Sequence, residues 1–376
     1  MQRGFLWLSA LLALYVSGFA CATTEPLAPG DEKPEPHIAL LLPLKSAVFG
    51  SAADTVRQGF QAAAILERQG LPVRIYNCFD ESKDIATLYH HAIDQGALAV
   101  VGPLTRSGTS TLAAEQNFPV PTLALNAAED QSVDQLYFFG MAAEVEARQV
   151  AHLASLQDFH QIIVITTATQ LSQRLRSAFE EEWNGLGGKI LREIEFNDDH
   201  AVLADITDMP DTAIFLAADA EKARLIRPYL LNKMPIYATS QIFVGNNDSL
   251  TNYDLNGIRF VDMPWLLQAD HPAVMIYPRA DPPLAADRER LYALGIDAFR
   301  LIQLLLANKI NAALPLDGVS GEIQLRGHVF QRTSIPAVLA QGRAQLLNTR
   351  TWSAQVSNTQ ASPAIPTLSD QAIGKP

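Results

Sequence analysis

The sequence predicts an α/β protein of two doubly wound lobes with a crevice between them, and two observations carry this prediction. From His37 onward, short apolar runs alternate with amphipathic stretches, which is typical of parallel strands joined by crossover helices. The alternation continues through two successive series, residues 37–142 and 143–265. With 376 residues, 48% of them hydrophobic, the chain has ample material for two cores.

The first series begins with HIALLLPL, a continuous apolar run closed by Pro43 that predicts a buried strand. The following stretch, SAADTVRQGFQAAAILERQG, spaces Val56, Phe60 and Ala63 as one helix face and stops at Gly70. Next come the strand VRIYN, the helix DIATLYHHAIDQG, the strand LAVVG, a helix opened by small polar residues, and the strand PTLALN. YFFG closes the series.

The second series opens with the helix EVEARQVAHLASLQ and the strand QIIVITTA. The helix QLSQRLRSAFEEEWNGLGG ends at paired glycines and precedes the strand KILREIEF, whose polar and apolar residues alternate cleanly. The strand TAIFLAA, the helix DAEKARLIRPYLLNK and the strands PIYATS and IRFVDMP follow. Strands that alternate with helices imply parallel sheets with right-handed crossovers.

After the second series the chain is expected to return to the first lobe. RERLYALGIDAFRLIQLLLANK predicts a long helix with one apolar stripe, formed by Leu291, Leu294, Ala298, Leu301, Ile302 and Leu305. SGEIQLR and HVFQRTSI predict a two-stranded ribbon. We therefore assign residues 37–142 and 266–345 to lobe 1 and residues 143–265 to lobe 2, and interpret the Ser-, Thr-, Pro- and Gln-rich residues 346–376 as a mobile tail.

Residues 1–20 have the order of a secretory signal: one arginine, an apolar run too short to span a membrane comfortably, and small residues. Ala20-Cys21-Ala22 fits a cleavage site that releases a soluble protein. Gly18-Phe19-Ala20-Cys21 also resembles a bacterial lipobox, with Gly18 where leucine is usual, and we favour acylation of Cys21. Residues 21–36 form a Pro-rich polar segment suited to a flexible tether.

No residue pattern points to catalysis or to a metal. The net charge of −12 and the lack of a basic stripe argue against a nucleic-acid partner. The eight histidines are dispersed, and no H-E-x-x-H, C-x-x-C or nucleophile-elbow spacing occurs. We assign no catalytic residue, metal or cofactor, and interpret Cys78 as a partly buried free thiol.

Several phrases, taken in order, resemble known proteins. HIALLLPLKSAVFGSAADTVRQGFQAA resembles the first strand, loop and helix of type I periplasmic-binding-protein folds, ALAVVGPLTRS the third strand and VPTLALN the fourth. ARLIRPYLLNKMPIYATSQIF, GIRFVDMPWLL, GIDAFRLIQLL and SGEIQLRGHVFQR together resemble the LppC/LpoA family, the lipoprotein activators of penicillin-binding proteins. The resemblance covers residues 37–343.

This resemblance implies a type I periplasmic-binding-protein-like fold with Rossmann-like lobes. It also implies a periplasmic lipoprotein, acyl-anchored at the inner leaflet of the outer membrane, that binds and activates a class A (bifunctional) penicillin-binding protein without catalysis. Longer family members carry an N-terminal helical-repeat domain, where this chain has a spacer of about fifteen residues. A second function stays open: a soluble solute receptor that closes on an amino acid, a peptide or a cell-wall fragment.

In ligand-binding members of this fold, loops after the first, third and fourth strands face the crevice. The candidate residues here are Lys45, Ser46, Thr105, Arg106, Ser107 and Asn126 from lobe 1, and Thr167, Ser240 and Gln241 from lobe 2. Hydroxyls and N–H groups at a helix start suit a carboxylate, and Lys45 or Arg106 would add charge. The alternative, which we prefer, is that these are capping and turn residues that the fold needs anyway.

Trp265 in DMPWLL is a candidate anchor for a partner, because tryptophan is enriched at interface centres. It also falls where a strand leaves lobe 2, so that packing at the hinge is the alternative interpretation.

Overall fold

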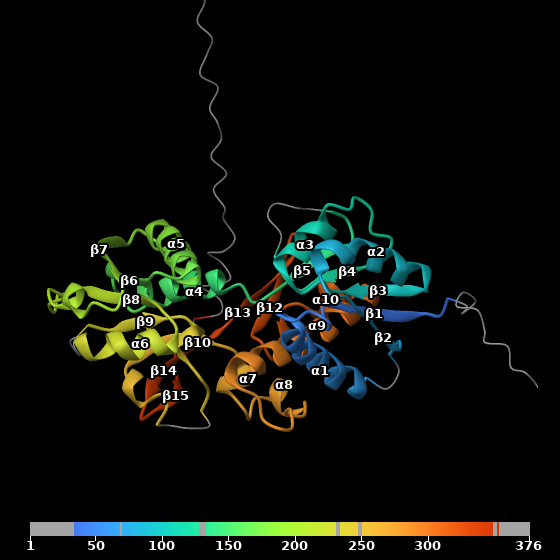
Figure 1. Ribbon diagram of the computed structural model, residues 1–376. Helices are drawn as coiled ribbons and strands as arrows, with labels where there is room; N and C mark the ends of the chain where they lie inside the picture. Colours follow the sequence, from blue (N-terminus) through green and yellow to red (C-terminus); the bar gives the residue numbers. More distant parts are fainter. Residues whose placement is uncertain are drawn as a thin grey trace, which may run out of the picture. The chain divides into compact units, whose positions relative to one another are not determined.

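Two sheets organise the chain (Figure 1). The computed structural model describes residues 34–67, 70–127, 133–230, 234–246, 250–348 and 352. The predicted signal segment, Cys21 and most of the predicted tether therefore lie outside the described residues. Glu35, near the end of that tether, is described; its N–H donates to Gln95 O (3.2 Å) and its carboxylate pairs with Arg74 (2.5 Å).

The first sheet is mostly parallel, with an antiparallel ribbon at one end. Its strand order is β11 (Leu316–Asp317), β12 (Glu322–Arg326), β13 (Val329–Thr333), β5 (Leu136–Phe139), β4 (Thr122–Ala124), β3 (Ala97–Val101), β1 (His37–Leu42) and β2 (Val73–Asn77). The ribbon of β12 and β13 is the one predicted from SGEIQLR and HVFQRTSI.

Helices cover both faces of this sheet, as the continuous apolar run of β1 predicts. Ile38, Leu40 and Leu42 point toward α1 (Gly50–Leu66) and α9 (Ala286–Leu306). Ala39 and Leu41 point toward α2 (Glu81–Asp94) and α3 (Arg106–Ala113). We call this sheet with its helices lobe 1.

The second sheet has the strand order β15 (Arg343–Leu346), β14 (Ile335–Ala340), β10 (Ile258–Asp262), β9 (Ile236–Ala238), β8 (Thr212–Ala217), β6 (Gln161–Thr167) and β7 (Lys189–Phe196). On one face, α4 (Ala143–Ser155) and α5 (Gln170–Gly185) pack over β6 and β8 (Figure 1). On the other face lie α6 (Ala220–Ile226) and the 3₁₀ turns η1 (His200–Leu203) and η4 (Tyr253–Leu255). We call this sheet with its helices lobe 2.

Short elements complete the described chain: α7 (Pro264–Leu267), α8 (Pro272–Met275), α10 (Ile310–Ala313), η2 (Arg227–Tyr229) and η3 (Ser240–Ile242).

Helices α1 and α9 touch backbone to backbone at two glycines. A Cβ atom on Gly59 would lie 1.9 Å from the carbonyl oxygen of Tyr292, and one on Gly295 would lie 2.1 Å from that of Val56. Neither position tolerates a side chain without moving a helix, so these glycines set the helix separation.

The chain passes between the lobes three times: from β5 to α4, from β10 to α7, and from β13 to β14. The third crossing corrects the predicted assignment of residues 335–345 to lobe 1, because β14 pairs antiparallel with β10 and β15 with β14. The strand β13 runs through Ser334 straight into β14. Without a glycine or a turn at that point, the sequence gives no sign of the change of sheet.

The predicted start of the mobile tail, residue 346, is also wrong. Leu346 belongs to β15, and Trp352 is buried, with its indole N–H donating to Ser334 O at 2.7 Å. Trp352 thereby covers the third crossing. Residues 353–376 lie outside the described part of the chain.

Candidate functional site

A cavity of about 570 Å³ lies at the carboxyl ends of the lobe 1 strands, and residues of lobe 2 line its other side. Parallel sheets commonly bind ligands at this edge. The structure brings five of the nine predicted residues to its wall: Thr105, Arg106, Ser107, Asn126 and Gln241. We call this cavity the crevice.

The crevice has an apolar floor and a charged rim. The floor consists of Phe49, Leu104, Leu125, Met141, Leu171, Leu291 and Leu294. On the rim, Arg106 of lobe 1 and Arg174 of lobe 2 both approach the same Glu144 oxygen, at 3.6 Å and 3.5 Å. Both arginines are about half exposed, at 55% and 49%, so that this rim cluster is positive and accessible to a partner.

The loop between β3 and α3 leads into three of the predicted residues, Thr105, Arg106 and Ser107, and two of its backbone donors are already occupied. The carboxylate of Glu81, at the start of α2, accepts the N–H of Leu104 at 2.9 Å and that of Thr105 at 2.7 Å. Glu81 is only 2% exposed, and burial raises its pKa above the ordinary value. An internal carboxylate thus uses two N–H groups immediately before the start of α3.

Two predicted side chains in the crevice wall are likewise engaged. Thr105 Oγ1 accepts the Gly108 N–H at 3.1 Å, which caps α3. Asn126 donates from Nδ2 to Leu104 O and accepts the Ala127 N–H at Oδ1, both at 3.0 Å. For Thr105 and Asn126 the structure therefore shows the capping and turn roles.

The other four predicted residues, Lys45, Ser46, Thr167 and Ser240, do not line the crevice. The Lys45 ammonium lies 5.3 Å from the centre of the Phe79 ring, and Ser46 Oγ accepts the Phe49 N–H at 3.2 Å. Thr167 donates its N–H to Ser172 Oγ at 2.8 Å. Ser240 is buried against α4 and α9, as described next.

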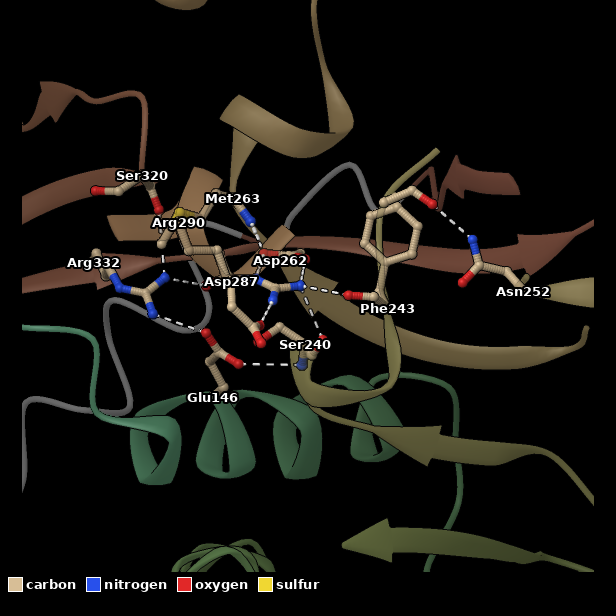
Figure 2. A network of polar contacts seen from close by, with 12 residues as sticks. Glu146, Ser240, Phe243, Asn252, Asp262, Met263, Asp287, Arg290, Ser320 and Arg332 are labelled. Carbon is tan, nitrogen blue, oxygen red and sulfur yellow. Dashed lines mark hydrogen bonds and ion pairs between the residues drawn. The ribbon is translucent and has the colours of Figure 1, made fainter. Parts of the chain in front are cut away.

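Beside the crevice, two buried ion pairs join the lobes (Figure 2). Arg332 of β13 meets Glu146 of α4 at 2.8 Å, and both side chains are 4% exposed. Arg290 of α9 meets Asp262, the last residue of β10, at 2.7 Å. We call Glu146, Asp262, Arg290 and Arg332 the interlobe network.

Backbone groups of lobe 2 complete the interlobe network. The second Glu146 oxygen accepts the N–H of Ser240 at 3.2 Å, a contact drawn in Figure 2. Arg290 Nη2 donates to Ser240 O at 3.0 Å and to Phe243 O at 2.9 Å. Burial alone would lower the pKa of Arg290, but the adjacent Asp262 carboxylate outweighs it and raises that pKa, so Arg290 stays charged.

Sequence reasoning missed the interlobe network and Glu81. Asp262, for example, ends the strand IRFVD, in which Ile258, Phe260 and Val261 are buried. A charged side chain at such a position is buried only together with a partner. Its occurrence at the end of a buried strand could therefore have indicated an ion pair.

Trp265 is not an exposed anchor. Its side chain is fully buried, its Nε1 donates to Glu289 at 2.5 Å, and the Arg279 guanidinium lies 3.7 Å from the ring centre. The alternative interpretation, packing at the hinge, is confirmed.

Among the described residues, no three His, Cys, Asp or Glu side chains gather as metal ligands would. Within the same residues, no helix combines the length and apolar character needed to cross a membrane. Cys78 is a buried free thiol, as expected.

The profile of one protein family, described as "LppC putative lipoprotein", matches residues 31–212 and 205–332. The chain belongs to the LppC family. This confirms the resemblance seen in the sequence. Curated relatives of this LppC chain are named penicillin-binding protein activator LpoA. The protein from Haemophilus ducreyi is 28% identical over 300 residues, covering 76% of this chain and 49% of the relative.

The corresponding protein of Haemophilus influenzae is 26% identical over 299 residues, covering 76% of this chain and 50% of its own. The LppC chain thus spans about half the length of the curated relatives it matches.

Solved structures confirm the type I periplasmic-binding-protein-like fold of this LppC chain. The LpoA C-domain from Haemophilus influenzae, described as a regulator of PBP1A, matches with a TM-score of 0.70 at 23% identity, covering 83% of this chain and 99% of that one. A protein described as a branched-chain amino acid ABC transporter from Chromobacterium violaceum matches with a TM-score of 0.69 at 37% identity, covering 81% and 100%.

Proposed function

We propose that this protein activates a class A penicillin-binding protein in the periplasm. The observation that carries the proposal is the family match, together with curated relatives named as penicillin-binding protein activators that align with 76% of this chain. Peptidoglycan synthesis would then be the process it regulates, with the synthase as its direct partner.

We further propose that Cys21 is acylated and anchors the protein to the inner leaflet of the outer membrane, with the Pro-rich residues 21–36 as the tether. Lipobox-like residues before Cys21 and the Pro-rich segment after it support this placement. Intact-mass measurement of the membrane-extracted protein tests it, because diacylglyceryl and acyl groups add a defined mass at the N-terminal residue.

Activation requires no catalysis by the activator. If the protein binds the active conformation of the synthase more tightly than the inactive one, binding alone shifts the population toward the active form. A surface held in fixed geometry suits this role, because little binding energy is then used to order the activator. The interlobe network supplies such rigidity where the two lobes meet.

A second candidate function, a solute receptor, is favoured by the 37% identity to the protein described as a branched-chain amino acid transporter. A receptor of this kind needs free polar groups in the crevice to bind the ends of an amino acid. Here Glu81 takes two of the backbone donors, Thr105 and Asn126 bond to nearby backbone groups, and Arg106 and Arg174, which keep N–H donors, are half exposed at the rim. This arrangement favours the activator.

The deciding experiment adds the purified mature chain to the class A penicillin-binding protein of the same bacterium. We expect faster glycan polymerisation, faster transpeptidation or both, saturating with activator concentration. Unchanged synthase rates would contradict the activator proposal. A rise in the Tm of this protein on adding leucine or a peptidoglycan peptide would then support the receptor proposal instead.

A further inference from the structure

We propose that the crevice receives a segment of the protein partner, with an apolar side chain in the cavity and carboxylates against Arg106 and Arg174. The inference rests on the proposed function and adds to it the site and the chemistry of the partner segment. Three features of the crevice carry it: its floor, its rim and its fixed walls.

The floor favours an apolar side chain. Seven hydrophobic residues line it, and at one edge Phe49 is 47% exposed, beside Val48 at 79%. A cavity of about 570 Å³ is several times the volume of one leucine or phenylalanine side chain, so that it accommodates a short stretch of chain as well. Burying one such side chain contributes a substantial part of the affinity of a protein interface.

The rim favours carboxylates. Arg106 and Arg174 share the single carboxylate of Glu144, at distances of 3.5–3.6 Å that are long for charge-assisted hydrogen bonds. The guanidinium groups therefore keep N–H donors for a further acceptor. Because one arginine comes from each lobe, an acidic segment crossing the mouth of the crevice would contact both lobes.

The fixed position of the two lobes favours a segment of a partner protein over a small solute that the lobes would have to enclose. Small-molecule sites usually surround most of the ligand, which a two-lobed protein achieves by closing. Rotation of lobe 2 on lobe 1 would move Ser240 and Phe243 relative to Arg290, which bonds both of their carbonyl groups (Figure 2). A segment on a larger protein can enter an open crevice without any closure.

The first test is photo-crosslinking of the mature chain to the purified class A synthase. The crosslinking amino acid benzoylphenylalanine replaces Ser107, which is exposed at the crevice wall, or Lys309 as control. Lys309 is also exposed but follows the far end of α9, about 20 Å along the helix from Leu294. We expect a crosslink to the synthase from position 107 and none from position 309.

The second test is charge reversal. We expect the double variant Arg106→Glu/Arg174→Glu to raise the activator concentration for half-maximal stimulation at least about tenfold, since two attractive contacts become repulsive. The double Arg→Lys variant should retain most of the stimulation, and Lys309→Glu, a single charge reversal outside the crevice, all of it. Thermal unfolding verifies that each variant is folded.

The outcomes separate this inference from the function on which it rests. Wild-type stimulation that survives the double reversal, with equal crosslinking from both positions, overturns the crevice site and leaves the activator in place. A wild-type protein without any stimulation overturns both. A Tm increase with leucine that the double reversal abolishes would assign the crevice to a solute and also overturn the inference.

Discussion

Arg332 and Glu146 form an ion pair of 2.8 Å across the two lobes although 186 residues separate them in the chain. One turn along α4, Gln149 donates to the carbonyl oxygen of Arg332 at 2.8 Å and accepts the N–H of Ser334 at 3.0 Å. One face of α4 therefore binds both the Arg332 side chain and the backbone of Arg332 and Ser334, where the chain makes its third crossing. The position of lobe 2 on lobe 1 depends on these contacts.

Removing one member of this pair should be strongly destabilising. Arg332→Met leaves Glu146 buried with the Ser240 N–H as its remaining partner among the described residues, and we expect the free energy of unfolding to fall by about 3–5 kcal/mol. Urea denaturation followed by tryptophan fluorescence measures it. The control is Arg148→Met, which breaks an exposed pair with Glu181 and should cost no more than about 1 kcal/mol.

The double variant Arg332→Met/Glu146→Leu should recover much of that loss, because it removes both charges at once. If the double variant is as unstable as the sum of its single variants, the two residues act independently and the pair does not join the lobes energetically.

Helix packing in lobe 1 should depend on the two contact glycines. We expect Gly59→Ala and Gly295→Ala each to lower stability by about 1–3 kcal/mol or more, because the added methyl group meets a backbone carbonyl of the other helix. Gly185→Ala at the end of α5 is the matched control: nothing lies within 4 Å of its new Cβ, and it should be neutral or slightly stabilising. Equal effects at all three positions in a Tm series would contradict this account.

Cys78 should resist thiol reagents in the folded protein. Burial, with the carboxylates of Glu81, Asp84 and Asp80 nearby, raises the pKa of its thiol to about 12. We expect iodoacetamide at pH 8 to label it far more slowly in buffer than in urea, as followed by mass spectrometry. Rapid labelling of the folded chain would mean that the thiolate is accessible there.

Glu81 should make stability depend on pH in a definite direction. Burial raises its pKa, so the folded protein binds this proton more tightly than the unfolded chain does. Its contribution to stability is therefore full below the unfolded pKa and is lost as the pH rises through the raised folded pKa. Gln at this position carries no titratable proton.

We compare wild type with Glu81→Gln by urea denaturation from about pH 4 to about pH 7. The wild type should lose stability relative to the variant as the pH rises across this range. Parallel stability curves would show that Glu81 has an ordinary pKa despite its burial.

The alternating pattern predicted the fold because buried parallel strands are continuous apolar runs, and β1, β6 and β8 are of this kind. The predicted ends of the elements were less accurate where a single residue, such as a proline, interrupts the apolar pattern. The helix expected through residue 233 ends as α6 at Ile226, because Pro228 lacks an N–H and turns the next residues into the 3₁₀ turn η2.

The site was predicted in part, and for a physical reason. Thr105, Arg106 and Ser107 lie at the crevice because strand ends and helix starts are placed by the topology itself. Ser240 and Thr167 do not, because both are buried in lobe 2, where their N–H groups donate to Glu146 and Ser172. The pairing of Arg332 with Glu146 joins distant segments, and no spacing in one sequence reveals it.

The three crossings also impose an order of assembly. The edge of β5 is covered only when β13 arrives, since Phe138 pairs with Val329 after the whole of β6 to β10 has been made. During synthesis the strands of lobe 1 therefore emerge first and stay incomplete the longest. Because each lobe is built from separate segments of the chain, neither lobe can be excised, exchanged or duplicated as one contiguous stretch. Recombination therefore has to transfer both lobes together.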